Sequence, residues 1–288
     1  MQMELVGIGR FPVKSMLGET PRRAPVEASG LVGDRAHGVV DTETGMVASA
    51  KRPSLWGGLL GLSARYVDRP GAGRPLVITL ADGTVLSSEQ PDFDQRLSAA
   101  VGRPVKLTTA PEPDAGYEDE WPDIEGLAPQ EVIQSTRTST SEEGNPVSTL
   151  PVGMMAPGTF QDVAPVTIMT TATLRKATEL QPTSRWDPRR FRCNLLVDVE
   201  GAAFVENGWE GRCLRVGEVV LRIAAPIPRC VMTTLPQQDL PADREILRTL
   251  ARHNRQEVAG TGAYACLGAY AGVLEPGRVV LGDHVDLL

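Results

Sequence analysis

The sequence predicts a mainly β protein with a few helices, of the α+β class, with an antiparallel β-barrel or sandwich at its core. Three observations lead to this fold class. Glycine and proline are frequent, at 29 and 23 of 288 residues, whereas aromatic residues make up only 5%. Short apolar runs of strand length recur along the chain and are separated by tight turns. Only three stretches have helical spacing, and no repeat of fixed period occurs.

Residues 1–110 are predicted to form strands joined by turns. The stretch MELVGIGRFPV is extended, GVVDTETGMVAS forms a hairpin around Thr44-Gly45, and PLVITLADGTVLSS turns at Asp82-Gly83. A short helix over DFDQRLSAAVG ends at Gly102. This part is therefore expected to be a β module with one helix.

Residues 111–158 differ in composition from the rest of the chain. PEPDAGYEDEWPDIEG is acidic, and STRTSTSEEGNPVST is polar and rich in small side chains. A segment of this length and composition predicts an acidic, flexible loop or lid. Its acidity could dock a basic redox partner, although a solvated loop explains the same composition.

Residues 159–288 are predicted to begin with a strand over VTIM, followed by a helix over ATLRKATEL with threonines at its start as N-cap candidates. FRCNLLVDV predicts a strand that starts near Phe191, and CLRVGEVVLRIAAP a hairpin that turns at Gly217-Glu218. DREILRTLARHN predicts an amphipathic helix. The C-terminal stretch predicts two or three closing strands with a turn at Pro276-Gly277.

Charge and cysteine content exclude several classes of protein. A net charge of −7 argues against nonspecific binding of nucleic acid. No run has the length and apolarity of a membrane span, and MQMELVGIGR lacks the regions of a signal peptide, so we expect a cytoplasmic protein that does not associate with membranes. The four cysteines are far apart and include no CxxC pair, which favours free thiols over a zinc site.

Two stretches are candidates for binding an anion. The free N–H groups and the hydroxyls of Thr171 and Thr173 at a helix start suit a phosphate, although most such threonines only cap their helix. In DPRRFRCN, a strand starting near Phe191 would place Arg190 and Arg192 on one face, where their guanidinium groups could donate paired hydrogen bonds to phosphate. A surface strand with solvated arginines is the alternative.

Cys230 is the candidate for a reactive thiol. In PIPRCVMTT it follows Arg229 at the end of an apolar run, and threonine hydroxyls follow it. This setting predicts a stabilised thiolate with a lowered pKa, which could act as a nucleophile, carry a persulfide or bind a soft metal. A small buried core residue is the alternative.

Several ordered motifs together resemble the MOSC-domain proteins. They are RFPVKSMLGE, GLVGDRAHGVVD, GTFQDVAPVTIMTTATL, RRFRCNLLVD, FVENGWEGRCLRVGEVVLRI, PIPRCVMTT and GVLEPGRVVLGDHVDL. The first part is similar to the β-barrel module that often precedes a MOSC domain. The chain is most similar in kind to the mitochondrial amidoxime-reducing component and its bacterial relatives. The implied division is an N-terminal module over 1–110, a loop over 111–158 and a MOSC domain over 159–288.

The resemblance implies a molybdenum cofactor, in which a pterin dithiolene holds the metal and Cys230 is a further ligand. Arg229 and Thr233 are expected to shape the surroundings of that cysteine. The expected contacts to the pterin and its phosphate come from both halves of the chain: Lys14, Ser15, Arg35, Thr171, Thr173, Arg190, Arg192 and Asn194. About the first 35 residues must then fold against the second half.

The function that the resemblance implies is reduction of N-hydroxylated or N-oxide-type small molecules at molybdenum. The chain lacks the four closely spaced cysteines of a [2Fe–2S] domain, so electrons are expected from a separate donor such as a ferredoxin, a flavodoxin or a cytochrome b5-like protein. The alternative is a carrier of sulfur, as a persulfide on Cys230, or of the cofactor itself. A third possibility is a cofactor-free protein that binds another small molecule in its barrel.

Overall fold

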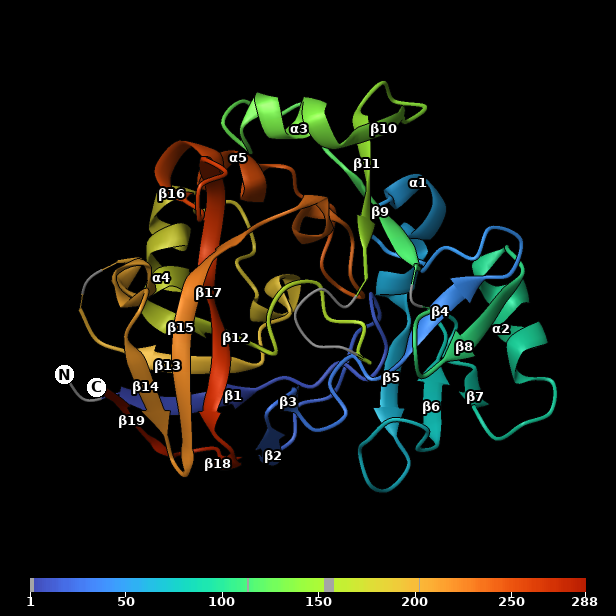
Figure 1. Ribbon diagram of the computed structural model, residues 1–288, viewed down its shortest axis with the longest axis horizontal. Helices are drawn as coiled ribbons and strands as arrows, with labels where there is room; N and C mark the ends of the chain where they lie inside the picture. The colour runs from blue at the N-terminus through green and yellow to red at the C-terminus, as the bar shows by residue number, and fades with distance from the viewer. Residues whose placement is uncertain (1–2, 113, 153–157, 202) are drawn as a thin grey trace.

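Seven strands from both ends of the chain form a closed β-barrel in the computed structural model, which describes residues 3–112, 114–152, 158–201 and 203–288 (Figure 1). A pairing between the first and last strands of the order closes the barrel. The strands in order are β12 (Val166–Thr170), β13 (Leu195–Val199), β1 (Met3–Ile8), β19 (His284–Leu287), β14 (Cys213–Val216), β15 (Val219–Pro228) and β17 (Ala263–Glu275). A short strand, β16 (Arg255–Glu257), extends the sheet beside β17. The predicted mainly β class with a barrel core is confirmed.

The N-terminal strand β1 lies between β13 and β19, more than 180 residues away in the sequence. Met3 pairs with Val199 on one side and with Val285 on the other. Met3 and Leu5 are buried in the barrel core, as the alternation of a half-buried strand requires, and Ile8 joins them after a register shift between Leu5 and Gly7. The barrel is therefore incomplete without the first residues of the chain.

Two helices pack against the outside of the barrel (Figure 1). Their apolar faces form a second core with Met169 and Leu267 from the barrel strands. The predicted helix over DREILRTLARHN is present and buries its apolar face. These helices are α4 (Thr171–Leu180) and α5 (Glu245–His253), and three 3-10 turns accompany them, η2 (Pro188–Phe191), η3 (Val205–Trp209) and η4 (Val231–Thr234). In the described part of the chain, no helix has the length and apolarity needed to cross a membrane.

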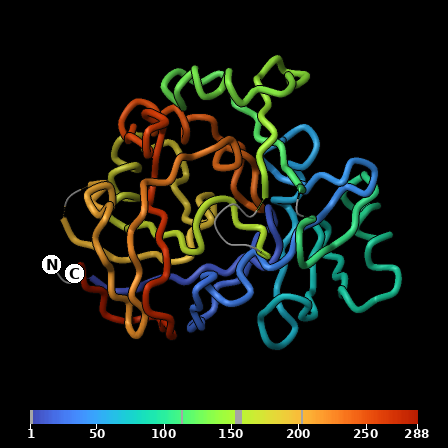
Figure 2. The backbone as a smooth tube through the Cα atoms, in the orientation of Figure 1, coloured from blue at the N-terminus to red at the C-terminus, as the bar shows by residue number. Residues whose placement is uncertain are grey.

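The N-terminal module lies beside the barrel and has its own apolar core (Figures 1 and 2). The predicted helix in this module is present and ends at Gly102, whose φ of 75° is the left-handed conformation that terminates a helix. That helix is α2 (Phe93–Val101), and the other elements of the module are β4 (Gly38–Asp41), α1 (Pro53–Trp56), η1 (Gly57–Gly61), β5 (Ser63–Tyr66), β6 (Leu76–Thr79), β7 (Val85–Ser87) and β8 (Val105–Thr108). The strands β2 (Arg23–Glu27) and β3 (Gly30–Leu31) instead contribute to the barrel core. Strand β18 (Gly277–Val280) pairs with β2 and links the end of the chain to its beginning.

The segment 111–158, which the composition predicted to be a flexible loop or lid, contains regular structure instead. It forms β9 (Gly116–Glu120), α3 (Gln130–Thr136), β10 (Arg137–Thr140) and β11 (Pro146–Pro151), and the three strands make a separate sheet. Its acidic side chains are not all solvated, because Asp119 and Glu120 are buried against Lys51 and Arg52. Residues 153–157 of the predicted loop lie outside the described residues.

The strand predicted to start near Phe191 begins later, at Leu195. Pro188 and the side chain of Asp187, which accepts a hydrogen bond from the Arg189 N–H, start the 3-10 turn η2 instead. Arg192 follows in the left-handed conformation, with a φ of 52°. Arg190 and Arg192 therefore do not share the face of a strand.

Candidate functional site

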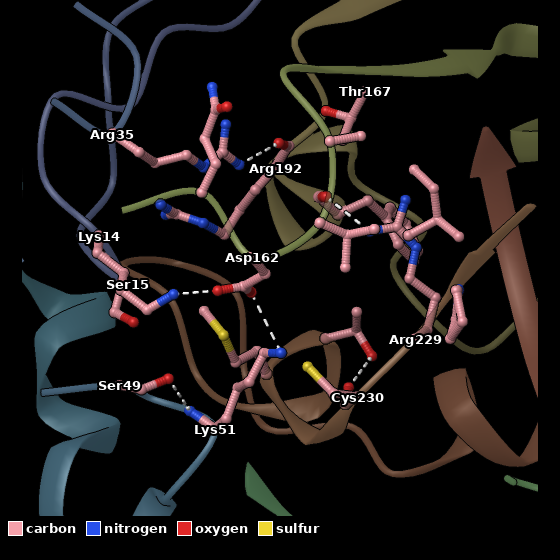
Figure 3. Close-up of a pocket in the computed structure, with 18 of the residues that line it drawn as sticks. Lys14, Ser15, Arg35, Ser49, Lys51, Asp162, Thr167, Arg192, Arg229 and Cys230 are labelled. Atoms are coloured by element: carbon pink, nitrogen blue, oxygen red, sulfur yellow. Dashed lines mark hydrogen bonds and ion pairs between the residues drawn. The ribbon is translucent and has the colours of Figure 1, made fainter. Parts of the chain in front are cut away.

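A pocket lies where the N-terminal module meets the mouth of the barrel, and segments from both halves of the chain line it (Figure 3). The lining comes from residues 14–15, 35, 49, 51, 160–164, 167, 190–192, 227–230, 232–233 and Tyr270. Eight of the eleven residues predicted for the site line this pocket: Lys14, Ser15, Arg35, Arg190, Arg192, Arg229, Cys230 and Thr233. The structure therefore brings together groups that are up to 219 positions apart in the sequence.

Cys230 lies just after β15, where the chain turns into η4, and its sulfur points into the pocket (Figure 3). The hydroxyl of Thr233 donates to the Cys230 carbonyl at 3.1 Å and fixes this turn. Burial raises the pKa of the Cys230 thiol, and the positive charge of Lys51 only partly opposes the effect. The predicted lowering of the thiol pKa is therefore wrong for the unliganded protein.

Arg229 does not stabilise a Cys230 thiolate, although it precedes Cys230 in the sequence. Its guanidinium donates to the carbonyls of Leu267 at 2.8 Å and Phe191 at 2.9 Å, and contacts the sulfur of a different cysteine, Cys193. These hydrogen bonds connect Phe191 at the end of η2 to Leu267 in β17 and point the guanidinium away from Cys230. Its charge still adds to the positive potential of the lining.

Two arginines form one end of the pocket (Figure 3). Arg35 donates to the backbone carbonyl of Arg192 at 3.0 Å, and both guanidinium groups lie over the ring of Phe11, at 4.8 Å and 4.4 Å. Asp34 pairs with Arg35, and no carboxylate forms an ion pair with Arg192 among the described residues. Burial, with a further contribution from Arg35, lowers the pKa of Arg192 to about 9, which leaves it charged at neutral pH.

The backbone of the pocket lining is strained. Three of the six non-glycine residues with positive φ in the described part of the chain line this pocket: Ser15 (64°), Arg35 (47°) and Arg192 (52°). Each such conformation costs on the order of 1 kcal/mol and persists only where the surroundings impose it. Such strain concentrates at functional sites, so its position here is an independent indication of one.

A buried network of charges crosses the middle of the pocket (Figure 3). Asp162 accepts from the ammonium group of Lys14 and pairs with that of Lys51 at 3.1 Å. Lys51 also pairs with Asp119 at 3.1 Å and donates to the Tyr117 hydroxyl at 3.3 Å. The two ammonium groups hold the pKa of Asp162 well below its usual range, despite its burial.

The segment that carries Asp162 is held in place by close packing. Phe160 is fully buried, and its N–H donates to the Arg35 carbonyl at 2.8 Å. A Cβ on Gly38 would lie 2.5 Å from the Phe160 ring, so only glycine lets the ring pack there. The position of Asp162 therefore depends on the N-terminal module as well as on the barrel.

Two further residues predicted for the site have structural roles. The guanidinium of Arg190 donates to four backbone carbonyls, which leaves it few donors for a ligand even though it touches the pocket. Asn194 lies outside the lining and is buried. Its amide accepts from the Thr167 N–H at 3.0 Å and donates to the Gly9 carbonyl at 3.1 Å, so it joins β12 to the chain after β1.

Thr171 and Thr173, predicted to receive a phosphate, do not line the pocket. The Thr173 hydroxyl is fully buried and donates to the Glu206 carboxylate at 2.7 Å, and that of Thr171 donates to Asp198. The carboxylates occupy the position of the expected anion. The N-cap of α4 is Thr170, which accepts from the Thr173 N–H.

The sequence interpretation missed two charged residues that line the pocket, Lys51 beside Cys230 and Asp162. Lys51 follows the predicted hairpin within ASAKRP, and Asp162 lies within the motif GTFQD. Neither has a local pattern that distinguishes it from a surface residue. Their place in the pocket is revealed only by the ion pairs of the structure. Lys51, from the first module, pairs with the carboxylates of Asp119 and Asp162, from two later segments.

Comparison with protein families matches residues 157–286 to the MOSC domain and residues 2–93 to the MOSC N-terminal beta barrel domain. No curated protein matches the chain. Among solved structures, it is similar to the YUAD protein from Bacillus subtilis, with 9% identity, 99% of this chain and 94% of that chain covered, and a TM-score of 0.45. It is also similar to YiiM from Geobacillus stearothermophilus and from Escherichia coli, with 18% and 16% identity and a TM-score of 0.29 for each. Both YiiM matches cover 43% of this chain and 54% of that chain.

Proposed function

This chain belongs to the MOSC-domain proteins and carries a MOSC N-terminal β-barrel domain, and on this premise we propose that it is a molybdenum-cofactor-dependent oxidoreductase. Its proposed substrates are N-hydroxylated or N-oxide-type small molecules, and a separate protein donates the electrons. MOSC domains are linked to molybdenum-cofactor chemistry, including sulfurase-type reactions. The observation that carries the proposal is the sulfur of Cys230 in a pocket of mostly cationic side chains.

The donor set of the pocket suits a pterin phosphate with a thiolate-bound metal. Six cationic side chains and one carboxylate line the pocket, in a chain whose net charge is −7. Two of the six, Arg190 and Arg229, are occupied with backbone carbonyls. Lys14 and Lys51 are paired with Asp162, whereas Arg35 and Arg192 each donate to one backbone carbonyl and keep further N–H groups for an anion. Arginine in particular donates paired hydrogen bonds to phosphate.

Each group has a distinct proposed role. Arg35 and Arg192 hold the phosphate at their end of the pocket, and Cys230 binds the metal as a thiolate, the form in which cysteine acts as a ligand. When bound, the molybdenum group supplies oxygen-atom transfer and two-electron redox chemistry. Because the free Cys230 thiol has a raised pKa, metal binding must release its proton and is favoured at higher pH.

Replacement of the thiol tests this function. After expression in a host that makes the cofactor, we expect wild-type protein to reduce an aromatic amidoxime with a chemical electron donor, and Cys230→Ser to lose at least about 100-fold in rate. Cys213→Ser is the matched control, because Cys213 lies in barrel strand β14 away from the pocket. Full activity of Cys230→Ser would contradict the proposal.

The mass of the intact protein separates reduction from sulfur transfer. A persulfide adds about 32 Da to the protein, and we expect no such adduct on Cys230 of the active form. An adduct of this mass without molybdenum would instead favour a sulfur carrier.

A further inference from the structure

We propose that Lys51 forms an anion-binding subsite beside Cys230, which selects substrates that carry a carboxylate or a similar single negative charge near the reducible N–O group. The charges of the pocket alone indicate that Lys51 binds an anion. The statement that this anion belongs to the substrate rests on the proposed function. Asp162 is paired with Lys51 at this subsite, and the anionic group of the substrate replaces it there.

The position of Lys51 is the first argument. Its ammonium group lines the pocket at the Cys230 end, and the Cys230 sulfur points toward it (Figure 3). Arg35 and Arg192 lie at the other end, beyond Asp162 (Figure 3). The pocket thus has cationic groups on both sides of Asp162, and a phosphate held by the two arginines would not occupy the position beside Lys51.

The two carboxylates that neutralise Lys51 differ in accessibility. The side chain of Asp119 is 6% exposed and approaches from outside the pocket lining, whereas that of Asp162 is 28% exposed and lies within the lining. Asp119 is therefore a permanent partner, and Asp162 is the one that a ligand can reach. If the Asp162 side chain moves away, the Lys51 ammonium keeps its contact with Asp119 and turns a free N–H donor toward the pocket.

Two of the residues that contact the Lys51 ammonium, Tyr117 and Asp119, lie in a part of the chain that neither family match covers. Tyr117 and Asp119 belong to β9, whereas the matched regions are 2–93 and 157–286. The ring of Tyr117 lies 4.8 Å from the Lys51 ammonium and 4.4 Å from that of Lys14. A segment outside the matched domains that supports one cation of the pocket is a means of setting substrate selectivity.

The test compares two alkylating reagents that differ mainly in charge. Iodoacetate is an anion and iodoacetamide is neutral, and both react with the thiolate, so the ratio of their rates at Cys230 does not depend on the thiol pKa. Peptide mass spectrometry of metal-free protein measures this ratio at Cys230 separately from the other three cysteines. Dividing by the ratio for free cysteine removes the intrinsic difference between the reagents.

We expect the normalised ratio to be above one in the wild type and to fall about tenfold in Lys51→Met, because one nearby charge is lost. Lys51→Arg should retain the ratio within about twofold. Asp162→Asn should raise it several-fold, since it removes the competing carboxylate and keeps the cation. Lys176→Gln, on the exposed face of α4, is the matched control and should change nothing.

Two results would overturn the inference. An unchanged ratio in both Lys51→Met and Asp162→Asn would show that Lys51 does not attract anions to Cys230. A loss of bound pterin in Lys51→Met, after expression in a cofactor-producing host, would assign this cation to the cofactor instead of the substrate. Because alkylation needs no molybdenum, a failure of the proposed function would leave the measured anion preference intact.

Discussion

At the scale of the residue, the chemistry of Cys230 depends on groups that are distant in sequence. The neighbouring Arg229 is turned away toward backbone carbonyls, and the nearest favourable charge comes from Lys51. A sequence shows which residues adjoin a cysteine but not which ones face its sulfur. This is why the sequence predicted Cys230 as a site residue and predicted the direction of its pKa shift wrongly.

The pH dependence of Cys230 alkylation tests this environment. Burial and the carboxylates of Asp119 and Asp162 raise the thiol pKa, whereas Lys51 lowers it. In metal-free protein, the iodoacetamide rate at Cys230 should therefore rise with pH around a midpoint above that of free cysteine. Lys51→Met should move the midpoint further up, and Asp162→Asn should move it down. A wild-type midpoint below that of free cysteine would contradict this account of the pocket.

At the scale of the element, the start of α4 was predicted correctly as a strand-to-helix transition, but the phosphate site predicted there was wrong. The strand-to-helix transition over β12 and α4 was predicted from the sequence and is present. The threonine hydroxyls there donate to Glu206, which comes from η3 far along the chain. The buried Glu206 carboxylate accepts the hydrogen bonds that these hydroxyls would otherwise donate to a phosphate. No local sequence pattern indicates this carboxylate.

Substitution of Thr173 distinguishes the two roles. Thr173→Val removes a hydrogen bond to the buried Glu206 carboxylate and should lower the free energy of unfolding by about 1–3 kcal/mol. Denaturant unfolding measures the loss, and Thr178→Ala on the exposed face of the same helix is the control. Pterin per folded chain should be unchanged in Thr173→Val. A stable variant that fails to retain pterin would restore the phosphate role.

At the scale of the whole molecule, the site exists because the two ends of the chain fold together. β1 completes the barrel between β13 and β19, and the following residues bring Lys14, Ser15 and Arg35 to the pocket. The periodicity of the sequence predicted most strands of the barrel and a mainly β class, and the family resemblance indicated a barrel. The position of Lys51 depends on ion pairs with carboxylates of distant segments, and the acidic composition of residues 111–158 concealed a sheet; periodicity reports neither.

The most direct test of the central claim is the metal and its ligands in protein purified from a cofactor-producing host. Elemental and pterin analysis should give about one molybdenum and one pterin per wild-type chain. X-ray absorption at the molybdenum edge should show one fewer sulfur ligand in Cys230→Ser than in the wild type. Wild-type protein without molybdenum, or identical sulfur ligation in the two proteins, would contradict the account.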